Sequence, residues 1–140
     1  MPIQPPRILL IGAGRFGREH LAEWRRIEAM GEALLAGVVA RRAEVGASLE
    51  RETGVRAYAE LTDALLSSVD AVDIVTPPRT HAALVRRCLP WAHVLVEKPL
   101  AIDPQEAADL VTEARAGGRV LAVGHLFRFH PVVGELARVV

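Results

Sequence analysis

Short apolar runs alternate with amphipathic segments along the whole chain. Six segments are apolar or β-branched enough to predict strands, and they lie at residues 7–12, 33–40, 55–58, 69–78, 93–97 and 119–124. Helical spacing of apolar side chains, or helix-stopping residues, predict helices at 15–29, 43–54, 61–67, 80–91 and 103–118, with another from 132 onward. The 103–118 segment has the most complete boundary signals. Asp103 can cap it, Pro104 takes the first helical position and Glu106 completes a capping box.

This alternation of strands and helices predicts an α/β fold. Strands that are apolar throughout belong in a parallel sheet covered on both faces. Right-handed crossovers between such strands give a doubly wound parallel sheet, the Rossmann fold, here with about six strands. No linker, repeat or shift in composition divides the sequence, so we expect residues 1–140 to form one domain.

A glycine-rich loop, GAGRFG at residues 12–17, joins the first predicted strand to the first predicted helix. It fits the pattern G-x-G-x-x-G in the strand–helix context that a dinucleotide-binding loop requires. Gly12 would permit the tight turn, Gly14 would let a pyrophosphate approach the backbone, and Gly17 would let the helix pack closely. The other loop residues, whose amide groups would also face the phosphates, are Ala13, Arg15 and Phe16. A plain strand-to-helix turn is the alternative.

The end of the second predicted strand bears on which cofactor the loop would hold. An acidic residue there would bind both ribose hydroxyls of NAD and repel the 2′-phosphate of NADP. This strand instead ends with Ala40, followed by Arg41 and Arg42, whose guanidinium groups suit a phosphate. We therefore expect NADP, with NAD as the alternative. Solvated arginines at a helix start are the other interpretation, although they would oppose the helix dipole.

Composition and charge argue against several other classes of protein. The 17 basic and 17 acidic residues cancel, which argues against an electrostatic nucleic-acid binder. Cys88 is the sole cysteine and the five histidines show no metal-ligand spacing, so we predict neither disulfides nor a metal site. His20 and Trp24 are expected to be structural. Without a signal peptide or an apolar stretch near the roughly 18 residues of a membrane helix, a cytoplasmic protein is expected.

One basic residue differs from all the others. Lys98, within VLVEKPLA at residues 94–101, is the single lysine among 17 basic residues. It follows a predicted parallel strand, and open α/β sheets bind ligands at the carboxyl ends of their strands. A desolvated ammonium group can exchange a proton near neutral pH, whereas a guanidinium group effectively cannot. A catalytic role is therefore favoured over a surface lysine placed by chance.

Four motifs occur in a fixed order: the glycine loop, TPPRTH at 76–81, EKP at 97–99 and GHLFRFHP at 124–131. With these motifs the chain resembles the Gfo/Idh/MocA family, the relatives of glucose–fructose oxidoreductase and inositol dehydrogenase. The resemblance implies an N-terminal NAD(P)-binding domain followed by a separate substrate domain. It also implies reversible hydride transfer at a hydroxyl-bearing carbon of a sugar, cyclitol or related polyol.

The resemblance further implies roles for individual residues. Lys98 would lie beside the nicotinamide and the reacting hydroxyl group, and Glu97 would help to position both cofactor and lysine. The residues that would contact the cofactor outside the glycine loop and the arginine pair are Thr76, Pro77, His81, Glu97, Lys98 and Arg128. His81 could equally cap its helix. Pro78 departs from the family, which often has asparagine there, so one family contact to the cofactor is not expected.

The substrate domain that the resemblance implies is absent from these 140 residues. The favoured explanation is a piece of a longer enzyme. The alternatives are a short protein that binds NADP without turnover, as a sensor or regulatory module, or a partner chain that supplies the other half. A homo-oligomer is also expected. The last helix has an apolar side that could pack on the sheet or drive dimerisation. Its residues are Val132, Val133, Leu136, Val139 and Val140.

Overall fold

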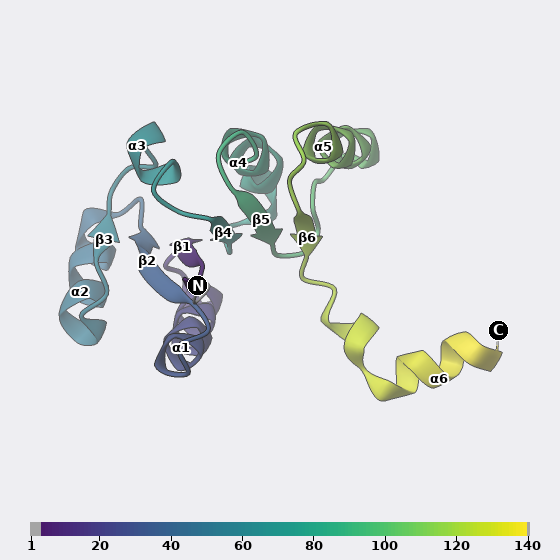
Figure 1. Cartoon of the computed structure of the whole chain (residues 1–140), viewed down its shortest axis with the longest axis horizontal. Helices are drawn as coiled ribbons and strands as arrows, with labels where there is room; N and C mark the ends of the chain where they lie inside the picture. The colour runs from purple at the N-terminus through teal and green to yellow at the C-terminus, as the bar shows by residue number, and fades with distance from the viewer. Residues whose placement is uncertain (1–3, 140) are drawn as a thin grey trace.

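Six parallel strands form one sheet in the order β3-β2-β1-β4-β5-β6 (Figure 1). The computed structural model describes residues 4–139. Its strands are β1 (Arg7–Ile11), β2 (Leu34–Val39), β3 (Ala57–Tyr58), β4 (Ala71–Ile74), β5 (His93–Val96) and β6 (Leu121–Val123). This order is that of a doubly wound Rossmann sheet, so the predicted fold class is confirmed.

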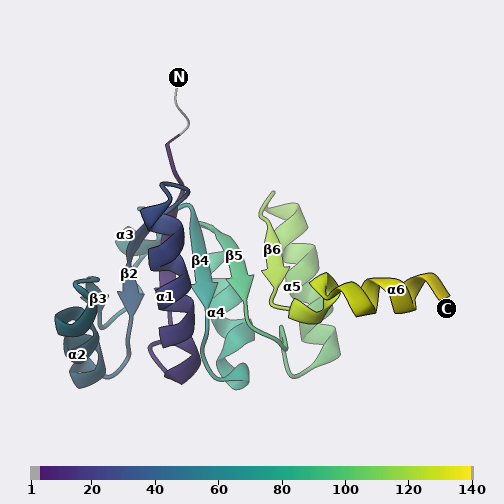
Figure 2. The ribbon, with the colours of Figure 1, turned by 90° about the horizontal axis from the view of Figure 1, so that it is seen from below.

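Helices cover both faces of the sheet. Figure 1 shows α1 (Arg15–Ala29) and α2 (Ala43–Thr53) on one face and α3 (Asp63–Leu66), α4 (His81–Cys88) and α5 (Pro104–Ala116) on the other. In Figure 2 the visible strands point the same way, which brings their carboxyl ends to one edge. Two short 3₁₀ helices, η1 (Pro78–Thr80) and η2 (Leu126–Phe129), follow β4 and β6.

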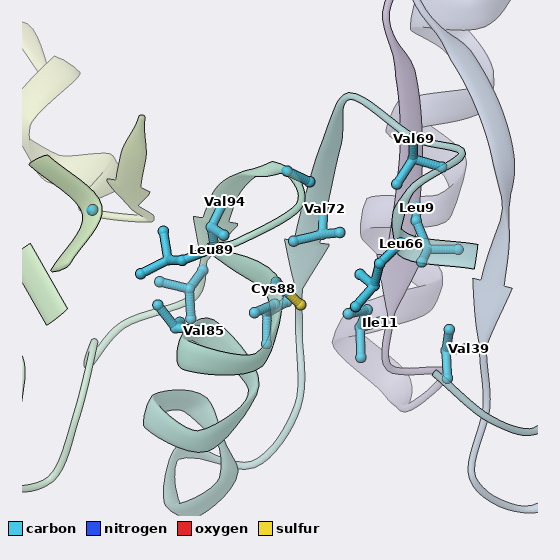
Figure 3. Close-up of a cluster of buried hydrophobic side chains, with 14 of the residues drawn as sticks. Leu9, Ile11, Val39, Leu66, Val69, Val72, Val85, Cys88, Leu89 and Val94 are labelled. Atoms are coloured by element: carbon cyan, nitrogen blue, oxygen red, sulfur yellow. The ribbon is translucent and has the colours of Figure 1, made fainter. Parts of the chain in front are cut away.

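A separate apolar core lies on each face. The larger cluster joins β1, β4 and β5 to the helices α3, α4 and α5. Figure 3 shows Val85 and Cys88 of α4, and Leu89 at its C-cap, directed toward strand residues that include Val72 and Val94. Burial raises the pKa of the Cys88 thiol to about 12, against a smaller opposing effect of the Arg87 charge, as is typical of a cysteine that packs in an apolar core.

Most elements are shorter than the sequence pattern predicts, for identifiable reasons. The strand predicted at 69–78 pairs with its neighbours only over Ala71–Ile74, because residues 75–78 leave the sheet and turn into η1. The helix predicted at 61–67 is the single turn α3, capped by the Thr62 hydroxyl oxygen, which accepts from the Leu65 amide at 3.2 Å. Thr62 sets the start of α3, whereas β4 ends before Val75, within an apolar, β-branched run.

The start of α5 confirms most of its predicted boundary. Asp103 Oδ1 accepts a hydrogen bond from the Gln105 amide at 2.8 Å, and Pro104 occupies the first turn. The predicted capping box is wrong in its second half. The Glu106 carboxylate lies 3.6 Å from the Arg86 guanidinium group, so an ion pair across to α4 replaces the capping contact.

The last helix, α6 (Pro131–Val139), projects away from the sheet (Figures 1 and 2). Of its apolar side chains, Val132, Val133, Leu136 and Val139 are all exposed. The prediction that this apolar side packs on the sheet is therefore wrong for these four side chains, and dimerisation stays a prediction. Val140 lies outside the described residues. None of the described helices is long and apolar enough to cross a membrane.

Candidate functional site

Two glycines in the 12–17 loop stand where no other residue fits. Gly12 has a φ of +121°, and a Cβ atom there would lie 2.2 Å from the carbonyl oxygen of Val75. A Cβ atom on Gly17 would lie 2.2 Å from the carbonyl oxygen of Gly12. The loop therefore folds back on itself and against the end of β4, and these two positions require glycine for close packing.

Gly14 meets the opposite condition. No heavy atom lies within 4 Å of the point where its Cβ would stand, so the space beside this residue is open. Gly14 is also the N-cap of α1, without a capping side chain and without an acidic residue in the first turn. The first amide groups of a helix have no partners within it and carry the positive end of the helix dipole. An open, uncapped helix start of this kind suits an anion.

Two adjoining hollows lie at the carboxyl ends of the strands. The first has a volume of about 430 Å³ and is lined by Phe16 and Gly17 on one side and by Glu97 and Lys98 on the other. The second, of about 600 Å³, extends past the ends of β1 and β2. Both hollows are lined by Gly14, Val75, Thr76 and Pro77. They therefore form one cleft beside the point where the sheet order reverses between β1 and β4, which is where doubly wound sheets bind ligands.

Positive charge gathers at the β2 end of this cleft. Arg41 and Arg42 follow β2 directly, both are exposed, and both line the second hollow. Arg79, on η1, lines the same hollow and was not singled out from the sequence. Among the ion pairs of residues 4–139, none joins these three guanidinium groups to a carboxylate. Ala40, at the position where an acidic residue would select NAD, is buried and carries no polar group.

The other end of the cleft carries the paired residues that follow β5. Lys98 is exposed to the first hollow, and Glu97 beneath it is buried, with 8% of its surface exposed. Glu97 Oε2 accepts a hydrogen bond from the Lys98 backbone amide at 3.2 Å. A Cβ atom on Gly124, at the end of β6, would lie 2.6 Å from Glu97 Oε1, so the glycine leaves room for the carboxyl group.

His81 lies behind the cleft wall and is fully buried. Its Nδ1 is 2.7 Å from the carbonyl oxygen of Pro99 and its Nε2 is 2.8 Å from that of Thr76. The imidazole therefore links the loop after β4 to the loop after β5. Arg128, on η2, is exposed and lines neither hollow, whereas its neighbour Leu126 lines the first. Leu126 lies within the GHLFRFHP motif, but no role was predicted for it from the sequence.

The fold and the cleft define a nucleotide-binding Rossmann domain whose glycine loop faces a lysine across one hollow. The chain belongs to the Gfo/Idh/MocA family of oxidoreductases. The family model, described as an oxidoreductase family with an NAD-binding Rossmann fold, matches residues 6–125. The resemblance carried by the four sequence motifs is thus confirmed.

Among curated relatives, the UDP-N-acetylglucosamine 3-dehydrogenase from Acidithiobacillus ferrooxidans is 40% identical over 128 residues, 91% of this chain and 39% of that protein. Inositol 2-dehydrogenase 4 from Saccharopolyspora erythraea is 36% identical, over 94% of this chain and 40% of its own length. Both names describe dehydrogenases of a sugar nucleotide or a cyclitol. The chain spans about two fifths of the length of these relatives.

Solved structures with bound cofactor share the fold. The WlbA dehydrogenase from Chromobacterium violaceum, in complex with NADH and UDP-GlcNAcA, has a TM-score of 0.85 at 26% identity and covers 99% of this chain and 40% of that one. KijD10, a 3-ketoreductase from Actinomadura kijaniata in complex with NADP and TDP-benzene, has a TM-score of 0.76 at 30% identity, over 96% and 41%. Both NADH and NADP therefore occur on domains of this shape.

Proposed function

We propose that this chain is the cofactor-binding half of an NADP-dependent oxidoreductase that transfers a hydride to or from a hydroxyl-bearing carbon of a sugar, cyclitol or related polyol. One observation carries the proposal. The glycine loop and the Glu97–Lys98 pair, about 80 residues apart in the sequence, line the same hollow. The names of the relatives, which act on inositol and on a UDP-sugar, support the substrate class.

The residues present fit a dinucleotide along the cleft. The pyrophosphate would be held by the amide groups that begin α1, beside the open space at Gly14. The adenosine half would occupy the second hollow and the nicotinamide half the first, with Thr76 and Pro77 forming the wall common to both. When bound, the nicotinamide would supply the hydride chemistry. The protein's own part is to bind, orient and exchange a proton.

Lys98 is the proposed proton-exchanging group. Hydride removal from an alcohol carbon also requires loss of the hydroxyl proton, and the reverse reaction requires its return. Lys98 lines the hollow, and among residues 4–139 no carboxylate forms an ion pair with its ammonium group. It is therefore available to a substrate oxygen. Glu97 acts from below by holding the Lys98 backbone amide.

The preference for NADP rests on the arginines at the β2 end. Arg41, Arg42 and Arg79 line the hollow that would receive the adenosine ribose, and the position that would carry an NAD-selecting carboxylate is Ala40. Guanidinium groups bind phosphate oxygens through charge-assisted hydrogen bonds. KijD10, with the higher sequence identity of 30%, holds NADP, whereas WlbA, with the higher TM-score of 0.85, holds NADH, so the choice rests on the arginines.

A fluorescence titration of the chain with NADPH and with NADH tests the proposal. We expect saturable binding of both, with the higher affinity for NADPH. An absence of binding would overturn the proposal, and equal affinities would overturn its NADP part. A binding-only module would bind in the same way and differ in turnover, which requires the substrate-binding part of the relatives. Homo-oligomerisation and a cytoplasmic location stay predictions of the sequence.

A further inference from the structure

A buried carboxylate interrupts the apolar strand β4. Asp73 is fully buried. Its Oδ2 accepts a hydrogen bond from Trp24 Nε1 at 2.7 Å and forms a second hydrogen bond with His20 Nδ1 at 2.8 Å. Its second oxygen, Oδ1, has no hydrogen-bond partner among the described residues. Burying a carboxylate is costly unless charged or polar groups compensate it. The two α1 side chains supply that compensation, so Asp73 anchors α1 to the sheet.

The imidazole of His20 lies between two carboxyl groups. On one side is Asp73, and on the other the Nε2 atom of His20 is 3.6 Å from Glu97 Oε1. Phe16, on the same helix, packs the edge of its ring against His20, with the ring centroids 4.8 Å apart. Phe16 and Glu97 both line the first hollow, so the imidazole stands directly behind the wall of the proposed nicotinamide pocket.

Asp73 Oδ2 accepts a hydrogen bond from the Trp24 indole N–H, which can only donate. When the same oxygen also accepts from His20, the hydrogen of that contact lies on Nδ1. The other ring nitrogen then faces Glu97 Oε1. At 3.6 Å this is an ion-pair contact, which is attractive when Nε2 also carries a proton; without that proton a lone pair would face a carboxylate oxygen.

We propose that His20 is a positioning residue for the nicotinamide end of the cleft: anchored on Asp73, its protonated ring attracts the Glu97 carboxylate and so holds the carboxyl group that receives the Lys98 amide. Three contacts confine that carboxyl group. They are with the His20 ring, with the Lys98 amide and with Gly124, against which the carboxyl group lies closely because glycine has no Cβ atom. The significance of this arrangement for the cofactor rests on the function proposed above.

The electrostatics of the cluster agree with a proton on His20. The hydrogen bond to Asp73 raises the pKa of His20 above its usual 6.5, burial opposes this, and the charges of Asp73 and Glu97 raise it further. The charged groups that face the ring come from β4 and from the end of β5, and the remaining α1 neighbours Phe16 and Trp24 are uncharged.

An NMR titration of the isotope-labelled chain tests the proposal without any activity measurement. We follow the His20 ring nitrogens and the Lys98 backbone amide over pH. In the wild type the Lys98 amide resonance is expected to shift with the midpoint of His20, and in His20→Gln this shift is expected to be lost. In Glu97→Gln, which keeps an acceptor for the Lys98 amide, the His20 midpoint is expected to fall because a negative charge is removed.

Two matched variants serve as controls. His93→Gln removes a histidine at the opposite end of β5, where its ring accepts from the Val120 amide at 3.0 Å, and Glu106→Gln removes a partly buried carboxylate on α5. Both should leave the Lys98 shift and the His20 midpoint unchanged.

The proposal is overturned if the wild-type Lys98 amide does not follow His20, if the shift persists in His20→Gln, or if Glu97→Gln leaves the midpoint in place. The wild-type and Glu97→Gln titrations decide the matter if His20→Gln fails to fold. A wild type that shows the coupling but binds neither NADPH nor NADH would overturn the proposed function and leave this inference standing.

Discussion

Gly12 and Val75 lie so close that a Cβ atom on Gly12 would stand 2.2 Å from the Val75 carbonyl oxygen. This contact joins the ends of β1 and β4, the two strands between which the sheet order reverses. Since both residues line the second hollow, the approach of the two backbones also shapes the cleft. The first turn of the glycine loop thus both holds the ends of β1 and β4 together and forms part of the cleft wall.

We expect Gly12→Ala to lower the free energy of unfolding by about 3 kcal/mol or more, since strain at a positive φ adds to a backbone clash. Gly31 is the matched control, because it also has a positive φ, +75°, but no atom lies within 4 Å of its Cβ position. Gly31→Ala should cost only about 1 kcal/mol. Urea denaturation of both variants measures the difference, and equal losses would contradict a role for the Val75 contact.

Arg41→Ala combined with Arg42→Ala should weaken NADPH binding about 100-fold, because each charge-assisted hydrogen bond to a phosphate contributes about 1.5 kcal/mol or more. NADH lacks the 2′-phosphate, so its affinity should not change. Fluorescence titration with both cofactors measures this, with Arg51→Ala at the far end of α2 as the control. A parallel loss for NADPH and NADH would show that the pair does not bind the 2′-phosphate.

Lys98→Ala and Lys98→Arg should both lower turnover about 100-fold or more, since a positioned acid–base group contributes at least that much and a guanidinium group cannot exchange the proton. The assay uses a chimera in which this chain replaces the matching segment of the 40% identical Acidithiobacillus ferrooxidans dehydrogenase. NADPH affinity should be retained. Full activity in Lys98→Arg would reject the proton-exchange role.

The stabilising effect of His20 should depend on pH. Its pKa is raised in the folded chain, above the 6.5 of the unfolded chain, so its contribution is complete below pH 6.5 and is lost as pH rises through the folded value. The difference in unfolding free energy between the wild type and His20→Gln should therefore be largest below pH 6.5 and shrink above it. Denaturant titrations across this range measure it, and a difference that grows with pH would have the wrong sign.

The spacing of apolar residues, together with the glycine, proline and capping residues between segments, predicted the helices and strands of the fold. Local signals sufficed where a glycine, proline or capping residue stands at the boundary of an element, as Thr62 and Asp103 do at the starts of α3 and α5. Where a boundary depends on the sheet, prediction was less accurate. Val75 and Thr76 continue an apolar, β-branched run, yet they leave the sheet to form the cleft wall.

The parts of the site that lie within one short motif were predicted from the sequence. The parts formed by residues distant in the sequence were missed. The glycine loop and the EKP segment are local patterns, and Arg79 was missed because nothing in the sequence places η1 beside the end of β2. His20 and Trp24 were expected to be structural. Their shared partner was not predicted, because Asp73 lies about 50 residues away in the chain. A carboxylate within an apolar strand was the available signal.

The central claim is that one cleft holds the dinucleotide between the glycine loop and Lys98. Backbone amide shifts of the labelled chain on addition of NADPH test it most directly. We predict that the largest shifts fall at residues 12–17, 41–42 and 97–98, and that Gly14→Ala, whose Cβ would enter the open space, abolishes them while leaving the fold intact. Shifts confined to other parts of the chain, or undiminished in Gly14→Ala, would contradict the account.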